Sequence, residues 1–244
     1  MSVISCYSSH MRTWKRFVFG HGLLAAGLAA TVTVGVVAGA QAPGVHPISG
    51  RRFAPVMGWQ GADWLERHER AEEEDPDTAI NVLKIARGSS VADIGAGSGY
   101  MTMKLSARVG PEGKVYANDI QPQMLQMLAS RLASGRITNV VLIQGTIDDP
   151  RLPDASVDLE MMVDVYHELS QPQAMLRHLR AALKPGGRLV LLEYRKEDPS
   201  VPIKYEHKMT VTEAKTEVEA EGFTLAKVDE SLPRQHILIF TMKP

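Results

Sequence analysis

The stretch that decides the fold is Val91-Ala-Asp-Ile-Gly-Ala-Gly-Ser-Gly-Tyr100, an apolar run that leads directly into alternating glycines. The apolar run is typical of a buried strand, and the residues from Tyr100 onward have a helical pattern. Glycines between a strand and a helix let the backbone turn sharply and approach a ligand without a clash from a Cβ atom. We therefore expect a ligand site at the 95–99 turn.

Strands and helices alternate on both sides of this turn. Asp75-Pro76 predicts the start of a helix that runs to about Ala86 before Gly88 stops it. Strands are expected at 90–94, 114–119, 140–144, 157–163, 188–194, 223–229 and 236–242, and helices at 100–109, 122–133, 170–184 and 210–221. Ser170 with Gln173, and Thr210 with Glu213, have the spacing of capping boxes.

This alternation predicts an α/β fold with a seven-stranded, mostly parallel sheet and helices on both faces. The last two strands are joined by a link too short for a crossover helix, so they should form an antiparallel C-terminal hairpin. We expect the domain to span 88–244. Residues 41–87 are predicted to be a linker followed by an N-terminal helical segment over Trp59–Glu74.

Residues 1–40 have the pattern of a signal peptide or a membrane anchor. Three basic residues (Arg12, Lys15, Arg16) precede an uncharged stretch, and Ala38-Gly39-Ala40 resembles a cleavage site. The apolar part is long enough for an uncleaved membrane anchor as well. In either case the positive flank stays cytoplasmic, which puts the body in the periplasm or on the outer side of the inner membrane. A body in the cytoplasm is expected only if the segment is not a working signal, and Met11 is an alternative start.

Composition excludes several classes of function. The 244 residues carry a net charge of −1, and no basic stripe lies beyond the N-terminus, so no nucleic-acid partner is expected. The single cysteine, Cys6, precedes the predicted cleavage site. A disulfide framework, a cysteine nucleophile and cysteine metal ligands are therefore excluded.

Three details of the turn restrict its ligand. The spacing is G-x-G-x-G, and the third glycine of the dinucleotide fingerprint falls at Tyr100, which weakens a pyrophosphate interpretation. Asp93 places a carboxylate at the strand end, where it suits an ammonium group. Asp119 lies 20 residues after Gly99 at the end of the second strand and can accept both hydroxyls of a ribose. Ile120 beside it can pack on an adenine.

The ligand that meets these requirements is a nucleoside with a cationic, phosphate-free tail. S-adenosylmethionine combines an adenosine, a sulfonium and an amino-acid head, so it is the cofactor we predict. An NAD-dependent dehydrogenase is the alternative that the glycine spacing disfavours. For Asp119 taken alone, a carboxylate that only caps a turn is a further alternative.

In these residues the chain resembles the class I S-adenosylmethionine-dependent methyltransferases, over roughly Gly88 to Lys243. The similarity is carried by Val91–Tyr100, by Val115–Asp119 and by Leu183–Leu189. It implies a Rossmann-like fold and a methionine moiety bound along the glycine turn, with Asp93 near its amino group and Asp119 on the ribose. The full cofactor-binding set it implies is Asp93, Gly95, Ala96, Gly97, Gly99, Asp119, Ile120, Thr146, Ile147 and Asp164.

The residues after the third strand depart from the family pattern. Relatives often have Gly-Asp there, with the carboxylate on the adenine amino group, whereas this chain has Gly145-Thr146. The role passes to Thr146 or shifts to Asp148, and Ile147 can still supply backbone contacts.

The end of the fourth strand, Asp164-Val-Tyr-His-Glu168, is the predicted catalytic end, because ligands sit beyond the carboxyl ends of parallel strands. Methyl transfer needs an aligned donor and acceptor, and a base when the acceptor is a hydroxyl or an acidic carbon. His167 is the best candidate base because it titrates near neutrality. Glu168 could orient His167 or act itself, and Tyr166 could bind the acceptor.

Other polar residues receive lesser roles. Glu193 is a second-line catalytic candidate, and His207 and His236 are expected to be structural or exposed. A metal site from His167, Glu168 and Glu193 is disfavoured, so no metal is predicted. Trp59 and Trp64 either wall an apolar acceptor site or simply pack.

The function we predict is methyl transfer to a small molecule that is apolar or membrane-associated, as in quinone-type methyltransferases. A non-catalytic protein that binds S-adenosylmethionine is the alternative from another class. S-adenosylmethionine is made in the cytosol, whereas the N-terminal segment points outward. The sequence leaves this conflict and the oligomeric state open.

Overall fold

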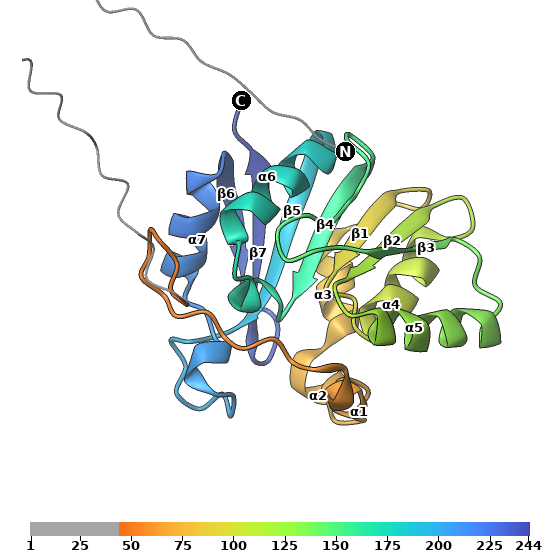
Figure 1. Ribbon diagram of the computed structural model, residues 1–244, viewed down its shortest axis with the longest axis horizontal. Helices are drawn as coiled ribbons and strands as arrows, with labels where there is room; N and C mark the ends of the chain where they lie inside the picture. Colours follow the sequence, from red (N-terminus) through yellow and green to blue (C-terminus); the bar gives the residue numbers. More distant parts are fainter. Residues whose placement is uncertain (1–43) are drawn as a thin grey trace, which may run out of the picture. The chain divides into compact units, whose positions relative to one another are not determined.

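The computed structural model describes residues 44–244. In this part of the chain seven strands form one sheet, in the order β3-β2-β1-β4-β5-β7-β6 (Figure 1). β1 to β5 are parallel, and β7 runs antiparallel to both of its neighbours, β5 and β6. The predicted sheet and its C-terminal hairpin are therefore confirmed. The strands are β1 (Ser90–Ile94), β2 (Lys114–Asp119), β3 (Val140–Gln144), β4 (Val157–Val163), β5 (Leu183–Tyr194), β6 (Phe223–Asp229) and β7 (Gln235–Met242).

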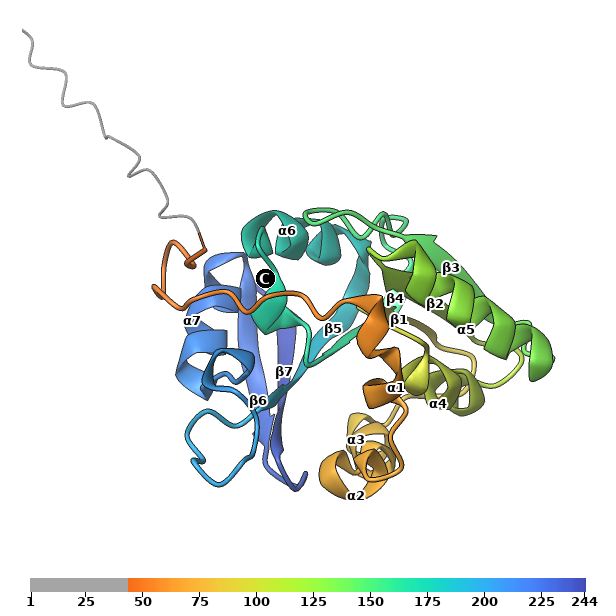
Figure 2. The same cartoon turned by 60° about the horizontal axis from the view of Figure 1, so that its bottom comes forward.

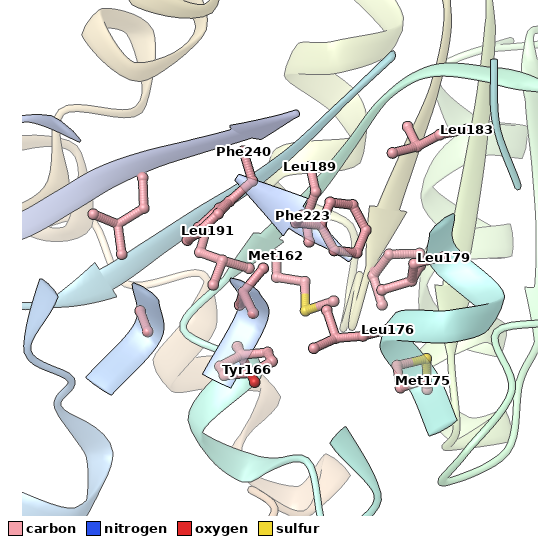
Figure 3. Close-up of a cluster of buried hydrophobic side chains, with 14 of the residues drawn as sticks. Met162, Tyr166, Met175, Leu176, Leu179, Leu183, Leu189, Leu191, Phe223 and Phe240 are labelled. Atoms are coloured by element: carbon pink, nitrogen blue, oxygen red, sulfur yellow. The ribbon is translucent and has the colours of Figure 1, made fainter. Parts of the chain in front are cut away.

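Helices cover both faces of the sheet, as expected (Figures 1 and 2). Alternate strand residues point to opposite faces, which divides the core in two. Val91 and Leu159 pack toward α3 (Pro76–Leu83) and α4 (Tyr100–Val109), while Ala92 and Leu189 pack toward α6 (Pro172–Ala182) and α7 (Val211–Ala220). α5 (Pro122–Ser134) lies beside α4 on the first face. Figure 3 shows part of the cluster on the α6 and α7 side.

Several local signals work as predicted. Asp75 accepts a hydrogen bond from the Thr78 N–H, and Pro76 is the first residue of α3. Thr210 and Glu213 form a capping box at the start of α7. Helix α3 nevertheless ends at Leu83, earlier than expected, because Lys84 adopts a left-handed conformation with φ of 48°.

The predicted helix at 170–184 has different ends. α6 starts at Pro172 after Gln171, and the N-cap makes no side-chain hydrogen bond, so the expected Ser170 capping box is wrong. Proline fits the first helical position, where its missing N–H costs nothing. At the other end β5 already begins at Leu183, whereas the helix was expected to reach residue 184 and the strand to start at residue 188.

The segment Trp59–Glu74 is not one helix. It divides into the 3-10 turn η1 (Trp59–Gly61) and two short helices, α1 (Ala62–Leu65) and α2 (Arg70–Glu74). Two arginine side chains stabilise the break between α1 and α2. Arg67 donates a hydrogen bond to the Trp64 carbonyl, and Arg70 donates one to the Leu65 carbonyl. These side-chain hydrogen bonds, which span three and five residues, satisfy carbonyl groups that a continuous helix would have paired internally.

The residues before α1 were predicted to be a linker, but from residue 44 onward they are packed against the domain (Figure 2). Arg51 is buried, pairs with Glu217 of α7 at 2.9 Å, and donates a hydrogen bond to the carbonyl of His167. This buried ion pair ties the segment to α7 and to the end of β4. No helix within residues 44–244 has the length and apolar character needed to cross a membrane. The predicted signal peptide or anchor at 1–40 lies outside the described residues.

Glu160, in the middle of β4, is fully buried, and neither carboxyl oxygen has a hydrogen-bond partner. Burial raises the pKa of Glu160 well above its ordinary value. The folded protein thus holds a neutral acid, whereas the unfolded chain ionises once the pH exceeds about 4.3. Stability therefore falls as the pH rises above that value, because the unfolded state releases the proton first.

We expect Glu160→Leu to raise the free energy of unfolding at pH 7 by about 1–2 kcal/mol, since an apolar side chain of similar size removes the desolvation cost. The gain should shrink at pH 4, where both states are protonated. Urea unfolding at the two pH values measures it, with exposed Glu112→Leu as the control. A variant that is less stable than wild type at pH 7 would contradict this assignment.

Candidate cofactor and acceptor site

A cavity of about 570 Å³ lies at the carboxyl ends of β1, β2 and β4, a typical size for a small-molecule site. The segment 55–57, helix α1 and residues 202–204 form its other walls. Most of the predicted site residues meet here. Those that line the cavity are Gly95, Gly97, Asp119, Ile120, Thr146, Ile147, Asp164, His167 and Glu168.

The glycine turn follows β1 as predicted, and Gly95, Gly97 and Gly99 all have positive φ. A Cβ atom on Gly99 would come within 2.3 Å of Leu128, and one on Gly95 within 2.5 Å of Val165. Gly99 and Ala96 do not line the cavity. Gly99 therefore serves the close packing of the turn on α5, whereas Gly95 and Gly97 face the ligand space.

Asp119 ends β2 and holds the glycine turn. One carboxylate oxygen accepts the Gly97 N–H and the other accepts the Gln121 N–H, both at 2.8 Å. Burial raises the pKa of Asp119, and these backbone hydrogen bonds oppose the rise. Each oxygen retains a lone pair for a second donor. The carboxylate can therefore accept two hydroxyl groups of a ribose in the cavity.

The predicted role of Asp93 at an ammonium group is not supported by its position. Asp93 is buried, does not line the cavity, and accepts a 2.6 Å hydrogen bond from the Thr102 hydroxyl. Burial raises its pKa to about 6. The Asp93 side chain points into the core from β1, and its hydrogen bond with Thr102 holds α4 against the strand.

Asp164 is better placed for that role. It lines the cavity, one oxygen accepts a 2.7 Å hydrogen bond from Gln235, and the other is buried without a partner. A buried acceptor without a donor is costly, and a ligand ammonium group would satisfy it.

Sequence reasoning missed Arg70, which lines the cavity from α2. Its side chain is buried, pairs with Glu74 at 2.7 Å and lies over the ring of Tyr100. Arg70 sits in a run of charged residues that is typical of a solvated helix face, so no local signal distinguished it. Trp64 also lines the cavity, whereas Trp59 does not.

The expected adenine end lies after β2 and β3. Ile120, Thr146 and Ile147 line the cavity here. Thr146 donates a 2.6 Å hydrogen bond to Asp148, which itself is not part of the wall. Of the two residues proposed for the adenine amino group, Thr146 is therefore the one in position.

At the other end, His167 is almost fully buried in the 3-10 turn η2 (Tyr166–Glu168). Its Nδ1 lies 2.6 Å from a carboxylate oxygen of Glu193, and its Nε2 lies 3.2 Å from Nδ1 of His207. A carboxylate can only accept, so Nδ1 carries the proton in the neutral ring and Nε2 offers a lone pair. Glu168 accepts the Met57 N–H, and burial raises its pKa to about 7.

Two predictions for this end are corrected. His207, expected to be structural or exposed, comes from the turn η3 (Tyr205–His207) and lines the cavity beside His167. Tyr166, proposed to bind the acceptor, is fully buried in the hydrophobic cluster (Figure 3). It is not among the residues that line the cavity. His236 is buried between Glu197 and Glu230 and stays structural, as expected.

Comparison with known proteins finds a methyltransferase domain in this chain. A methyltransferase-domain family model matches residues 91–187. The ubiquinone/menaquinone biosynthesis C-methyltransferase UbiE of Hahella chejuensis is 36% identical over 125 residues, which cover 51% of this chain and 49% of that protein. UbiE of Escherichia fergusonii is 35% identical over 118 residues, 48% of this chain and 47% of its own. The chain thus spans about half the length of the curated relatives it matches.

A solved structure extends the likeness to nearly the whole domain. The S-adenosylmethionine-dependent methyltransferase of Aquifex aeolicus superposes with a TM-score of 0.72 at 26% identity, over 78% of this chain and 100% of that protein.

The cavity itself fits the same cofactor. Asp119 and Asp164 both face it. Burial raises the pKa of Asp164 well above its ordinary value, and a ligand ammonium group beside it would favour the carboxylate, whereas a pyrophosphate would not. With the sheet order and the glycine turn, these findings support a class I S-adenosylmethionine-dependent methyltransferase domain in this chain, with S-adenosyl-L-methionine as its cofactor.

Proposed function

We propose that this protein transfers a methyl group from S-adenosylmethionine to a small apolar molecule, at a hydroxyl oxygen or an acidic carbon. The observation that carries the proposal is that one cavity joins the Asp119 cofactor end to a buried His167–Glu193 pair. A protein that only binds the cofactor has no need for a histidine held by a buried carboxylate at the far end.

The chain's residues divide the work of binding. Asp119 accepts the ribose hydroxyls, and Ile120 and Ile147 pack on the adenine. Arg70 attracts the carboxylate of the amino-acid head, while the free oxygen of Asp164 accepts its ammonium group. Together these contacts fix the position of the sulfur relative to the acceptor.

S-adenosylmethionine, when bound, supplies a methyl group on a cationic sulfur that leaves as a neutral thioether. What remains for the protein is to align the acceptor and remove its proton. Nε2 of His167 is the base that takes this proton, and Glu193 on Nδ1 stabilises the imidazolium that forms.

The walls near His167 favour an apolar acceptor. Val56, Met57, Leu169, Pro202 and Ile203 line this end. The UbiE relatives are named C-methyltransferases of ubiquinone and menaquinone biosynthesis. An acceptor that combines an apolar ring with a hydroxyl group fits these walls. The export or anchor segment predicted at 1–40 agrees with an acceptor in a membrane and remains a prediction.

Two measurements test the proposal in sequence. Calorimetry should detect binding of S-adenosylmethionine and none of NAD. With tritiated S-adenosylmethionine, label should then pass to the organic-soluble fraction of a cell extract and to hydroquinone-type phenols. Cofactor binding without transfer to any acceptor would make the protein a binder, and NAD binding would refute the cofactor assignment.

A further inference from the structure

We propose that His167, Glu168 and His207 form a binding site for a divalent transition-metal ion at the acceptor end of the cavity. Nε2 of His167 lies 3.2 Å from Nδ1 of His207 and 4.0 Å from Oε1 of Glu168. Oε1 of Glu168 lies 3.8 Å from Nδ1 of His207. One ligand atom from each residue therefore points into the same small space.

The two separations that involve Glu168 fit a metal ion better than they fit direct pairing. In a tetrahedral zinc site with bonds of about 2.0–2.2 Å, neighbouring ligand atoms lie about 3.3–3.6 Å apart. The carboxylate of Glu168 is too far from both rings for a hydrogen bond, yet close enough to share a cation with them. A shift of a few tenths of an ångström would complete the set.

The surroundings have the form of an outer shell around metal ligands. Glu193 holds Nδ1 of His167 at 2.6 Å, which fixes the ring and directs the lone pair of Nε2 to the shared space. The Met57 N–H donates to Glu168 and fixes its oxygen. His167 is nearly fully buried, so its ring cannot turn toward solvent.

The ligand types indicate which ion. Two imidazoles and one carboxylate suit Zn²⁺, and they also suit Fe²⁺, Co²⁺ and Ni²⁺. All three residues line the cavity, so the remaining coordination position faces the space where the acceptor is expected. Three protein ligands with one open position is the arrangement of catalytic rather than structural zinc sites.

This position has a consequence for the acceptor, which rests on the proposed function. A metal ion there would bind an acceptor hydroxyl and lower its pKa, so that the hydroxyl proton could pass to solvent water. We therefore expect hydroxylated acceptors rather than amines or thioethers. In the metal-loaded protein Nε2 of His167 would bind the metal ion, and this role would replace its role as the base.

Metal binding is tested without any methyl acceptor. Full-length protein without a histidine tag is stripped with a chelator and titrated with Co²⁺ under visible absorption, then with Zn²⁺ by calorimetry. We expect one equivalent of Co²⁺ to give the intense d–d absorption of a low-coordinate site, and Zn²⁺ to displace it.

Variants locate the site. Glu193→Gln should weaken Zn²⁺ binding about 10- to 100-fold, the usual loss for an outer-shell partner. His207→Ala should weaken it more, because a ligand is lost. The control His178→Ala removes an exposed histidine outside the cavity and should bind as wild type does. Glu168→Gln keeps the side-chain volume and provides a second test if His207→Ala folds poorly.

No saturable one-to-one binding, or wild-type affinity in both His207→Ala and Glu168→Gln, would overturn the proposal. Metal binding in a protein that transfers no methyl group would uphold the site and refute only the proposed function. Methyl transfer by protein that binds no metal would refute the metal site and uphold the proposed function.

Discussion

His167→Ala is expected to lower kcat for methyl transfer by about 10²–10⁴-fold, the usual contribution of a positioned base, while the affinity for S-adenosylmethionine stays within about twofold. This expectation follows from the position of the His167 side chain. His167 lies in η2, whose residues follow β4, and its hydrogen bonds are to Glu193 and His207 rather than to the turn that holds the cofactor. The substitution removes the imidazole ring, so residue 167 can then act neither as a base nor as a metal ligand.

The measurement is a comparison of kcat with the calorimetric affinity for S-adenosylmethionine, using the acceptor found in the transfer assay. His178→Ala is the matched control, because it removes an exposed histidine. Chelator-stripped wild-type protein separates the two roles: it should keep its activity if the ring acts as a base, and lose it if the ring holds a metal ion. Unchanged turnover in the variant would remove His167 from the mechanism.

Asp119→Ala should weaken the binding of S-adenosylmethionine by about 1.5–3 kcal/mol, roughly 10- to 150-fold, the scale of hydrogen bonds to a charged group. The carboxylate accepts the Gly97 and Gln121 N–H groups at 2.8 Å and has lone pairs left for the ribose. The substitution therefore removes both a ligand contact and a support of the glycine turn.

Two further variants separate these effects. Asp119→Asn keeps one oxygen acceptor, so its loss of affinity should be smaller than that of alanine. Asp154→Ala, on an exposed turn, should bind as wild type does. Calorimetry measures all three, and unchanged affinity in Asp119→Ala would refute the ribose contact.

The parts of the fold that follow from local pattern were predictable from the sequence. β1 to β4, α4 and the capping box at Thr210 depend on apolar periodicity and on residues a few positions apart. The division of residues 59–74 into separate helices was not predictable. The Arg67 and Arg70 side chains stabilise the break, because they donate hydrogen bonds to carbonyl groups that a continuous helix would pair internally. Such contacts have no periodic signature.

The candidate site, like the fold, was predictable from the sequence only in part. Asp119 and the glycine turn were found because the residues after parallel strands gather at one edge of the sheet. His207 was missed because it reaches the cavity from the long connection between β5 and α7, 40 residues after His167. Tyr166 was misplaced because adjacent side chains of the η2 turn point in different directions, one into the core and the next into the cavity.

The most direct test of the central claim, that this cavity holds S-adenosylmethionine between Asp119 and His167, is a crystal structure with S-adenosylhomocysteine bound. We expect both ribose hydroxyls within hydrogen-bond distance of the Asp119 carboxylate and the sulfur directed toward His167. A bound molecule whose ribose lies away from Asp119, or a sulfur turned from His167, would contradict it.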